Sequence, residues 1–359
     1  MRAQRLGAGV PDPQDISVPS LADKVSYLSG PAAYPARAGA VTRRETHMSW
    51  VFFADDTVYK LKKPIRLSYL DFSTLARREA ACRAEFALNQ RLAPGVYLGV
   101  EPLTWTADGL ALGGSGEVVD WLVRMRRLDE SRTLEALLQA DRADDLDLSG
   151  LAALLVRFFR HAPAVARSPA EHLAAWRALL AENRRVLLDP RLGLPQGAVR
   201  RVLAVQARFL RVRAAPLARR CAQRRIVDGH GDLRPEHIWM GPPVKIIDRL
   251  EFSARLRAVD RVDELASLEV EMERLGGAAA GLRLRRRVLA ALGERPPPEL
   301  YLFYRTYRAT LRARFAIAHL QDARPRTPEK WPIQARAYLA MAARDADRLE
   351  TLLRTPAGR

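Results

Sequence analysis

Residues 228–252 read DGHGDLRPEHIWMGPPVKIIDRLEF. Two short β-rich runs, 238–240 and 244–247, flank a Gly-Pro-Pro break, which is the pattern of a tight hairpin. We expect the outer ends of this hairpin to bring Asp232 and Asp248 beside one another. The stretch therefore predicts a polar loop, a hairpin and a second acidic loop, with two carboxylates held together.

Phosphoryl transfer needs two carboxylates with different roles. One orients and deprotonates the acceptor hydroxyl. The other, with a partner five residues after the first, holds Mg²⁺ on the nucleotide phosphates. Asp232, the residue at position 237 and Asp248 follow this order and spacing. Taken singly, His230-Gly231-Asp232 reads as an ordinary loop and Asp248 as a capping or ion-paired acid, but the joint pattern favours a phosphotransferase.

This stretch resembles the aminoglycoside phosphotransferase/choline kinase-like group of the protein-kinase-like superfamily, whose catalytic loop runs H-G-D-x-x-x-x-N and whose metal loop opens with Ile-Asp. The resemblance implies an α+β, bilobal protein-kinase-like fold with a small antiparallel-sheet N-lobe and a mostly helical C-lobe. It also implies that Asp232 is the catalytic base, that His230 braces the loop and that Asp248 is the principal metal ligand.

His237 stands where that family has Asn. Mg²⁺ prefers oxygen ligands, so an imidazole is a poorer partner for it than an amide oxygen. Three interpretations stay open. His237 binds the metal, with Mn²⁺ as the alternative ion, or it donates to a phosphate, or it marks weakened catalysis.

Lysine is concentrated near residue 60. Three of the six lysines lie within residues 60–63, while Arg supplies nearly all the other positive charge. The runs 51–53 and 57–61 predict a hairpin, and Lys60 and Lys62 share a face of its second strand because strand side chains alternate. A compact ammonium suits a phosphate site that a planar guanidinium does not fit.

A helix is predicted over residues 73–92. By the resemblance, Lys60 binds the α- and β-phosphates of ATP, and Glu85 on this helix holds the lysine in place. Glu79 is the second choice as its partner. The ordinary alternative for both acids is a solvated helix face.

The resemblance implies further nucleotide contacts from Lys62, Ser49 and Met125. Ser49 precedes the first strand, where such folds place a loop over the phosphates, and a plain turn is the alternative. Met125 lies where the chain crosses between lobes and backbone groups bind adenine. The predicted parts are a leader over residues 1–44, a phosphate-binding N-lobe over 45–127 and a helical C-lobe over 128–359.

Composition and simple sequence patterns argue against several other classes of protein. The sequence contains neither a run of eighteen apolar residues nor a signal-peptide pattern, so a cytoplasmic protein without a membrane partner is expected. Cys82 and Cys221 are too few and too far apart for a disulfide framework or a zinc site. The net charge of +18 raises nucleic acid as a partner. Because the basic residues are dispersed, no specific nucleic-acid site is expected.

The sequence thus predicts an ATP-dependent phosphotransferase that uses Mg²⁺, or Mn²⁺, and transfers the γ-phosphate to a hydroxyl of a small molecule. A neutral acceptor, or one with its own phosphate or carboxylate, suits the Arg-rich second half of the chain better than a polycationic aminoglycoside. The alternative is a kinase-like protein that binds nucleotide with little catalysis and serves as a regulatory or binding module.

Overall fold

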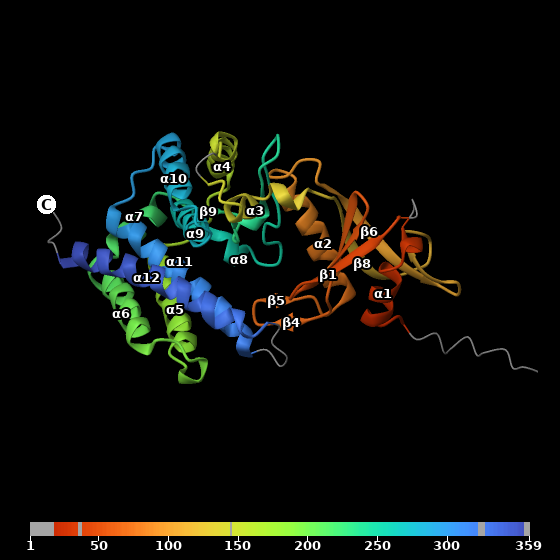
Figure 1. Ribbon diagram of the computed structural model, residues 1–359, viewed down its shortest axis with the longest axis horizontal. Helices are drawn as coiled ribbons and strands as arrows, with labels where there is room; N and C mark the ends of the chain where they lie inside the picture. Colours follow the sequence, from red (N-terminus) through yellow and green to blue (C-terminus); the bar gives the residue numbers. More distant parts are fainter. Residues whose placement is uncertain (1–17, 35–37, 144–145, 322–326, 355–359) are drawn as a thin grey trace, which may run out of the picture. The chain divides into compact units, whose positions relative to one another are not determined.

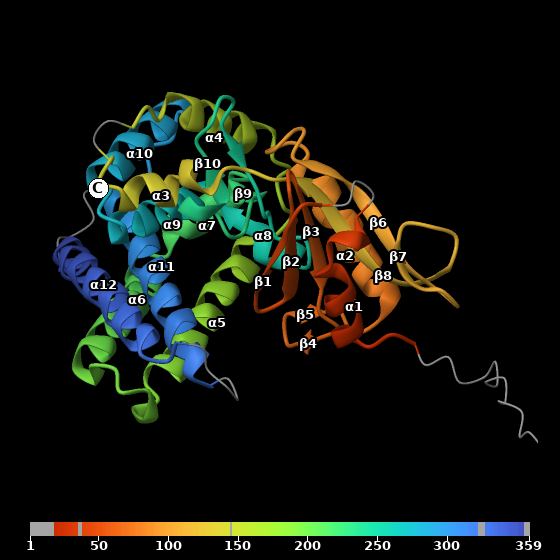
Figure 2. The same ribbon diagram turned by 45° about the vertical axis from the view of Figure 1, so that its right-hand side comes forward.

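The computed structural model describes residues 18–34, 38–143, 146–321 and 327–354. Residues 1–17 and 35–37 of the predicted leader lie outside them. The chain forms two compact units, Met1–Ala87 with Gly95–Arg127 and Leu88–Pro94 with Leu128–Arg359. The predicted α+β class is confirmed, because an antiparallel sheet dominates the first unit and helices dominate the second (Figure 1 and Figure 2).

A six-stranded antiparallel sheet forms the body of the first unit, in the order β1-β2-β3-β8-β6-β7. The strands are β1 (Val41–Glu45), β2 (Ser49–Ala54), β3 (Thr57–Lys62), β6 (Tyr97–Thr106), β7 (Gly109–Leu112) and β8 (Glu117–Arg126). Alternate side chains of these strands, among them Phe52, Leu61 and Leu122, form an apolar cluster. The hairpin expected from residues 51–61 is β2 and β3, and it carries Lys60 on the face opposite to Leu61.

Among the described residues, two α-helices and a small hairpin also belong to this unit. The elements are α1 (Leu21–Leu28), α2 (Leu75–Asn89), β4 (Arg66–Leu67) and β5 (Leu70–Asp71). Helix α1 begins at Ser20, whose hydroxyl accepts the N–H of Asp23 in a capping box. Val25 and Leu28 of α1 lie in the same apolar cluster as Phe52, so this helix is an integral part of the unit's core.

Charged side chains are also buried in the first unit. Asp120 of β8 accepts hydrogen bonds from Lys24 of α1 at 2.8 Å and from Arg78 of α2 at 2.6 Å. Lys24 also donates to the carbonyl of Val119 at 2.7 Å. All three charged residues are buried. A single carboxylate thus ties both helices to the sheet.

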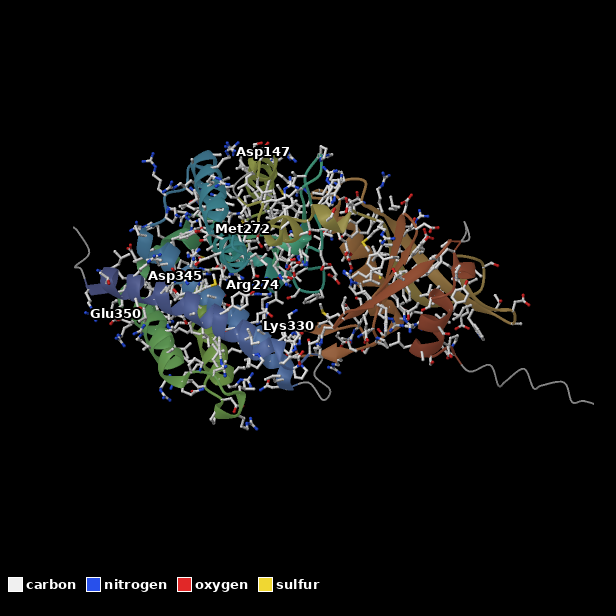
Figure 3. All side chains as sticks on the ribbon, viewed as in Figure 1. Asp147, Met272, Arg274, Lys330, Asp345 and Glu350 are labelled. Atoms are coloured by element: carbon white, nitrogen blue, oxygen red, sulfur yellow. The ribbon has the colours of Figure 1, made fainter. Side chains whose placement is uncertain are left out.

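The second unit is mostly helical. Its helices are α3 (Leu134–Gln139), α4 (Ser149–His161), α5 (Pro169–Leu187), α6 (Gln196–Val212), α7 (Ala215–Ala222), α8 (Ala254–Arg257), α9 (Arg261–Arg274), α10 (Ala278–Leu292), α11 (Pro298–Ala318) and α12 (Lys330–Arg354). Helices α11 and α12 run side by side in Figure 1 and Figure 2, and with α5 and α6 they enclose Phe209, Tyr304 and Tyr338. Met272 of α9, labelled in Figure 3, belongs to a second apolar cluster with α4 and α10.

Short strands interrupt the helices where residues 228–252 lie. They are β9 (Ile226–Asp228), β10 (Ile238–Trp239), β11 (Lys245–Ile246) and β12 (Ala258–Asp260). Strand β10 pairs antiparallel with β11, so the hairpin expected from the sequence is present. Strand β9 pairs with β12. Both polar loops therefore begin or end at paired strands, which limits how far their side chains move.

Neither cysteine reaches the surface, since Cys82 and Cys221 are both buried. Within the described ranges, no helix is both apolar enough and long enough to cross a lipid bilayer.

Candidate active site

One buried carboxylate on α2 binds two lysines of β3. Lys60 Nζ lies 2.9 Å from Glu85 Oε1, and Lys62 Nζ lies 2.6 Å from Glu85 Oε2. The two lysines meet the same acid because they are two residues apart on a strand and point to the same side. Glu79, the second choice as partner of Lys60, instead pairs with Arg83 one turn along α2, at 2.8 Å.

The two lysines differ in exposure. The Lys60 side chain is 16% exposed, whereas that of Lys62 is 1% exposed and has its ammonium 5.0 Å from the centre of the Phe72 ring. Lys62 is therefore buried with Glu85, whereas the Lys60 side chain is partly accessible to solvent. A direct contact between Lys62 and a nucleotide stays a prediction.

Ser49 and Met125 occupy strand positions in the same sheet. Ser49 begins β2, is buried and lies opposite Lys62 in the register with β3. Its N–H donates to Thr46 Oγ1 at 2.9 Å, which closes a tight turn before the strand. Met125 lies near the end of β8, opposite Val58 of β3. Their contacts with a nucleotide also stay predictions.

In the second unit, His230 ties the two polar loops together. The N–H of Asp232 donates to His230 Nδ1 at 3.3 Å, so the ring proton is on Nε2, which donates to the carbonyl of Ile247 at 2.9 Å. Burial lowers the pKa of His230 to about 4, so the ring is neutral at physiological pH. The residue before Asp248 is thereby fastened to the loop that carries Asp232.

Glu264 of α9 supports the same loop, a role that the sequence analysis did not assign to it. Its carboxylate accepts the N–H of His230 at 3.0 Å and that of Gly231 at 2.6 Å. Burial raises the pKa of Glu264 although both backbone N–H groups favour its ionised form. Gly231 has φ +88°, and a Cβ there would lie 2.9 Å from Leu250 Cδ1, so glycine is required at this position.

His237 lies between the two acids that the sequence singles out. Its Nδ1 is 2.9 Å from the main-chain carbonyl of Asp232 and 3.9 Å from Asp232 Oδ2. Its Nε2 is 3.5 Å from Asp248 Oδ2. The hairpin fixes this arrangement, since the N–H of Ile247 donates to the carbonyl of His237 at 2.9 Å. The structure thus brings Asp232, His237 and Asp248 together around one imidazole ring.

The Asp232 carboxyl is ionised more readily than an ordinary aspartate. Burial opposes its ionisation, but nearby positive charge, that of Arg234 first, outweighs burial and lowers the pKa of Asp232. Arg234 Nη1 lies 3.5 Å from Asp232 Oδ2. Arg312 of α11 is held by Glu271 at 2.6 Å. At neutral pH this site therefore presents a carboxylate.

Two arginines that the sequence interpretation missed clamp the polar loops. Arg249 Nη2 donates to Asp228 Oδ2 at 2.6 Å, and Arg257 Nε donates to Asp228 Oδ1 at 2.7 Å. Arg249 Nε also donates to the carbonyl of Gly229 at 2.9 Å, and Arg257 Nη1 to that of Leu250 at 2.7 Å. In a chain this rich in Arg, no local signal distinguishes these two from the others.

Within the residues that the structure describes, no three His, Cys, Asp or Glu side chains are grouped so as to hold a metal ion by themselves. His237 and Asp248 would supply two donors to an ion, since His237 Nε2 lies 3.5 Å from Asp248 Oδ2. Mg²⁺ on a nucleotide is commonly bound in this manner, with one or two protein ligands and with phosphates and waters as the rest.

Comparisons with known proteins were made at the level of sequence and of structure. No protein-family model matches the chain. Uncharacterised proteins of Mycobacterium tuberculosis and Mycobacterium bovis are 33% identical over 296 residues, which is 79% of this chain. The chain covers 56% of the length of these relatives.

Two solved structures define the fold. Choline kinase from Cryptosporidium parvum superposes with a TM-score of 0.54 at 10% identity, over 92% of this chain and 96% of that chain. A mutant aminoglycoside 2'-phosphotransferase-IIIa in complex with GDP superposes with a TM-score of 0.50 at 15% identity, over 88% and 94%. These likenesses confirm, for the fold, the resemblance read from residues 228–252.

Proposed function

We propose that this chain, which has the protein-kinase-like fold of those choline kinase and aminoglycoside phosphotransferase structures, is a nucleotide-dependent phosphotransferase acting on a small molecule. In its reaction the γ-phosphate of ATP moves to a hydroxyl of the acceptor. The observation that supports this most strongly is the loop assembly around His237, with Asp232 on one side and Asp248 on the other. Phosphoryl transfer uses acids in this order and spacing.

Asp232 would accept the proton of the acceptor hydroxyl. A bond forms between the acceptor oxygen and the γ-phosphorus, the bond from that phosphorus to the bridging oxygen breaks, and the nucleoside diphosphate leaves. Because its pKa is lowered, Asp232 is ionised and orients the hydroxyl rather than removing its proton early. His230 and Glu264 keep the carboxylate in position, so catalysis would come mainly from orientation.

Lys60 would bind the α- and β-phosphates in the first unit, with Glu85 holding its ammonium. The Lys62 ammonium forms an ion pair with the second carboxylate oxygen of Glu85. We assign Lys62 to positioning, because it keeps the Glu85 carboxylate in place when Lys60 turns toward a phosphate.

The residues fit a divalent metal ion. Asp248 offers a carboxylate whose side chain is 41% exposed, and His237 offers a ring nitrogen 3.5 Å away. Two adjacent ligands about 2.1 Å from an octahedral ion lie about 3.0 Å apart, so a small shift allows both to bind one ion. Such an ion, when bound, neutralises charge that develops on the transferred phosphoryl group.

The acceptor class follows from the charges beside Asp232. Arg234 and Arg312 are among the groups that lower its pKa. Both would repel a polycation such as an aminoglycoside. We therefore propose a neutral acceptor, or one that carries a phosphate or carboxylate.

A second candidate function is nucleotide binding with little catalysis, as part of a regulatory or binding module. The observation that favours it is His237 at the position of the family's Asn. A His237→Asn variant distinguishes the two functions. A large gain in turnover indicates a weakened enzyme, whereas a loss of turnover shows that the histidine is used.

A screen of hydroxyl acceptors tests the proposed function. Release of nucleoside diphosphate is followed with ATP and with GTP, each with Mg²⁺ and Mn²⁺, since one structural neighbour is a GDP complex. We expect acceptor-dependent release that falls at least about 100-fold in Asp232→Asn. Asp108→Asn, at an exposed turn, is the matched control. Full activity in Asp232→Asn would contradict the assigned role.

A further inference from the structure

The His237 ring is oriented by its own loop. Nδ1 lies 2.9 Å from the main-chain carbonyl of Asp232. A carbonyl oxygen only accepts, so Nδ1 carries the proton, and in neutral imidazole the lone pair is then on Nε2. Nε2 is the atom that faces Asp248, 3.5 Å from its Oδ2. Histidine ligands of metals are commonly fixed in this manner, through a hydrogen bond from the other nitrogen to a carbonyl.

The ring has little freedom to turn away from Asp248. Its side chain is 13% exposed, and it stacks on His230 with ring centres 6.0 Å apart and an angle of 24°. His230 is itself held at both nitrogens, by the N–H of Asp232 and the carbonyl of Ile247. Nε2 is therefore held in one orientation, in which it faces the Asp248 carboxylate.

We propose that His237 Nε2 and Asp248 form a mixed nitrogen and oxygen metal site that selects divalent transition ions, such as Mn²⁺, over Mg²⁺. This inference rests on the proposed function, because nucleotide phosphates would complete the coordination. Neutral His and Asn carry the same charge, so the exchange of Asn for His changes the donor atom from oxygen to nitrogen without changing the net charge of the site. Mg²⁺ demands oxygen donors and near-ideal octahedral geometry, whereas first-row transition ions bind imidazole well.

A histidine with only a structural role would make the same Nδ1 bond to the carbonyl of Asp232. The two roles differ in what Nε2 does, so the test must report on that atom. Electron paramagnetic resonance of bound Mn²⁺ does so, because a directly bound nitrogen nucleus modulates the signal. Histidine labelled with the heavy nitrogen isotope distinguishes imidazole from the nitrogens of ATP.

The experiment titrates Mn²⁺ into the protein with ATP, and in parallel with GTP, and obtains the Mg²⁺ affinity by competition. We expect a nitrogen coupling that changes with the histidine label. The preference for Mn²⁺ over Mg²⁺ should be about tenfold greater in the parent protein than in His237→Asn. His161→Asn, at an exposed histidine of α4, should change neither quantity. Asp248→Asn should weaken the binding of both ions and change the ratio of their affinities little.

Each outcome decides between the proposals. Nucleotide binding with equal ion preference in the parent and in His237→Asn, without a histidine coupling, overturns this inference and leaves the proposed function standing. A protein that binds neither nucleotide with any ion overturns both. If His237→Asn fails to fold, the labelled parent protein still reports whether a histidine binds Mn²⁺, and absence of that coupling overturns the inference.

Discussion

Glu85 shows how one buried carboxylate can hold two lysines of a strand. Its two carboxylate oxygens are divided between Lys60, which keeps access to the surface, and Lys62, which does not. Removal of one partner from a buried ion pair leaves an uncompensated charge, which is costly. Because the two lysines share an acid but differ in exposure, their removal should have different consequences.

Lys62→Met should mainly reduce stability, and Lys60→Met should mainly reduce nucleotide affinity. For Lys62→Met we expect a loss of about 3 kcal/mol in the free energy of unfolding, because Glu85 loses its more buried partner. Chemical unfolding and calorimetry with ATP measure the two effects. If Lys62→Met abolishes binding at full stability, the two assigned roles are reversed.

Glu264→Gln should destabilise the second unit by about 2 kcal/mol, because a charged acceptor of two backbone N–H groups becomes a neutral amide with one oxygen. The free energy of unfolding in urea measures this loss. Glu329→Gln, at an exposed acid, is the matched control and should change stability by less than about 0.5 kcal/mol. Equal losses in both variants would argue against the loop-bracing role.

His172 should make stability depend on pH. Burial lowers the pKa of His172 to about 4, below the ordinary value of 6.5. Between these values the unfolded chain binds more protons, so stability is lost as the pH falls. From pH 7 to pH 5 this residue should contribute a loss of about 2 kcal/mol. His172→Gln should flatten the dependence by that amount in unfolding experiments, and an unchanged slope would contradict the assignment.

The residues whose proximity the sequence could predict lie in one motif or stand out by composition. Asp232, His237 and Asp248 lie in a single stretch whose spacing is characteristic, and Lys60 stands out in a chain that otherwise uses Arg. Glu264 could not be identified from local sequence. It reaches the loop from α9, and a lone helical Glu is ordinarily a solvated residue.

At the scale of elements, Asp120 fixes the position of α2 on the sheet. The residue joins Lys24 of α1 to Arg78 of α2. Arg78 lies two turns before Glu85 on the same helix, so this buried cluster and the lysine-binding acid are carried by one rigid element. Helix α1 therefore contributes indirectly to the geometry of Lys60.

Asp120→Ala should destabilise the first unit by about 3 to 5 kcal/mol, because two buried cations lose their partner. Thermal and urea unfolding measure the change. Glu101→Gln, which removes a half-exposed pair with Arg124, is the matched control and should cost less than about 1 kcal/mol. A similar small effect in both variants would show that the cluster contributes little.

Hairpins were the elements that the sequence predicted best. Residues 51–61 and 238–247 each contain two β-rich runs around a turn, and such pairing is local in the chain. The order of the six-stranded sheet and the pairing of β9 with β12 join residues far apart in sequence. No periodicity encodes which distant strands meet, so these pairings required the structure.

At the scale of the whole molecule, some arginines of this basic chain lie in its interior. Arg305 is buried and binds Glu269, Glu273 and Asp345, linking α11 to α9 and α12. Arg274 and Asp345, both labelled in Figure 3, are likewise ion-paired. Part of the arginine content thus serves internal packing between helices of the second unit.

Lys60 belongs to the first unit and Asp248 to the second. The central claim is that the chain binds a nucleotide in a metal-dependent manner, and calorimetry of ATP with Mg²⁺, with Mn²⁺ and without metal tests it most directly. We predict metal-dependent binding in the parent protein that weakens at least about tenfold in Asp248→Ala and in Lys60→Met. Binding that survives both substitutions, or no binding with any ion, would contradict the account.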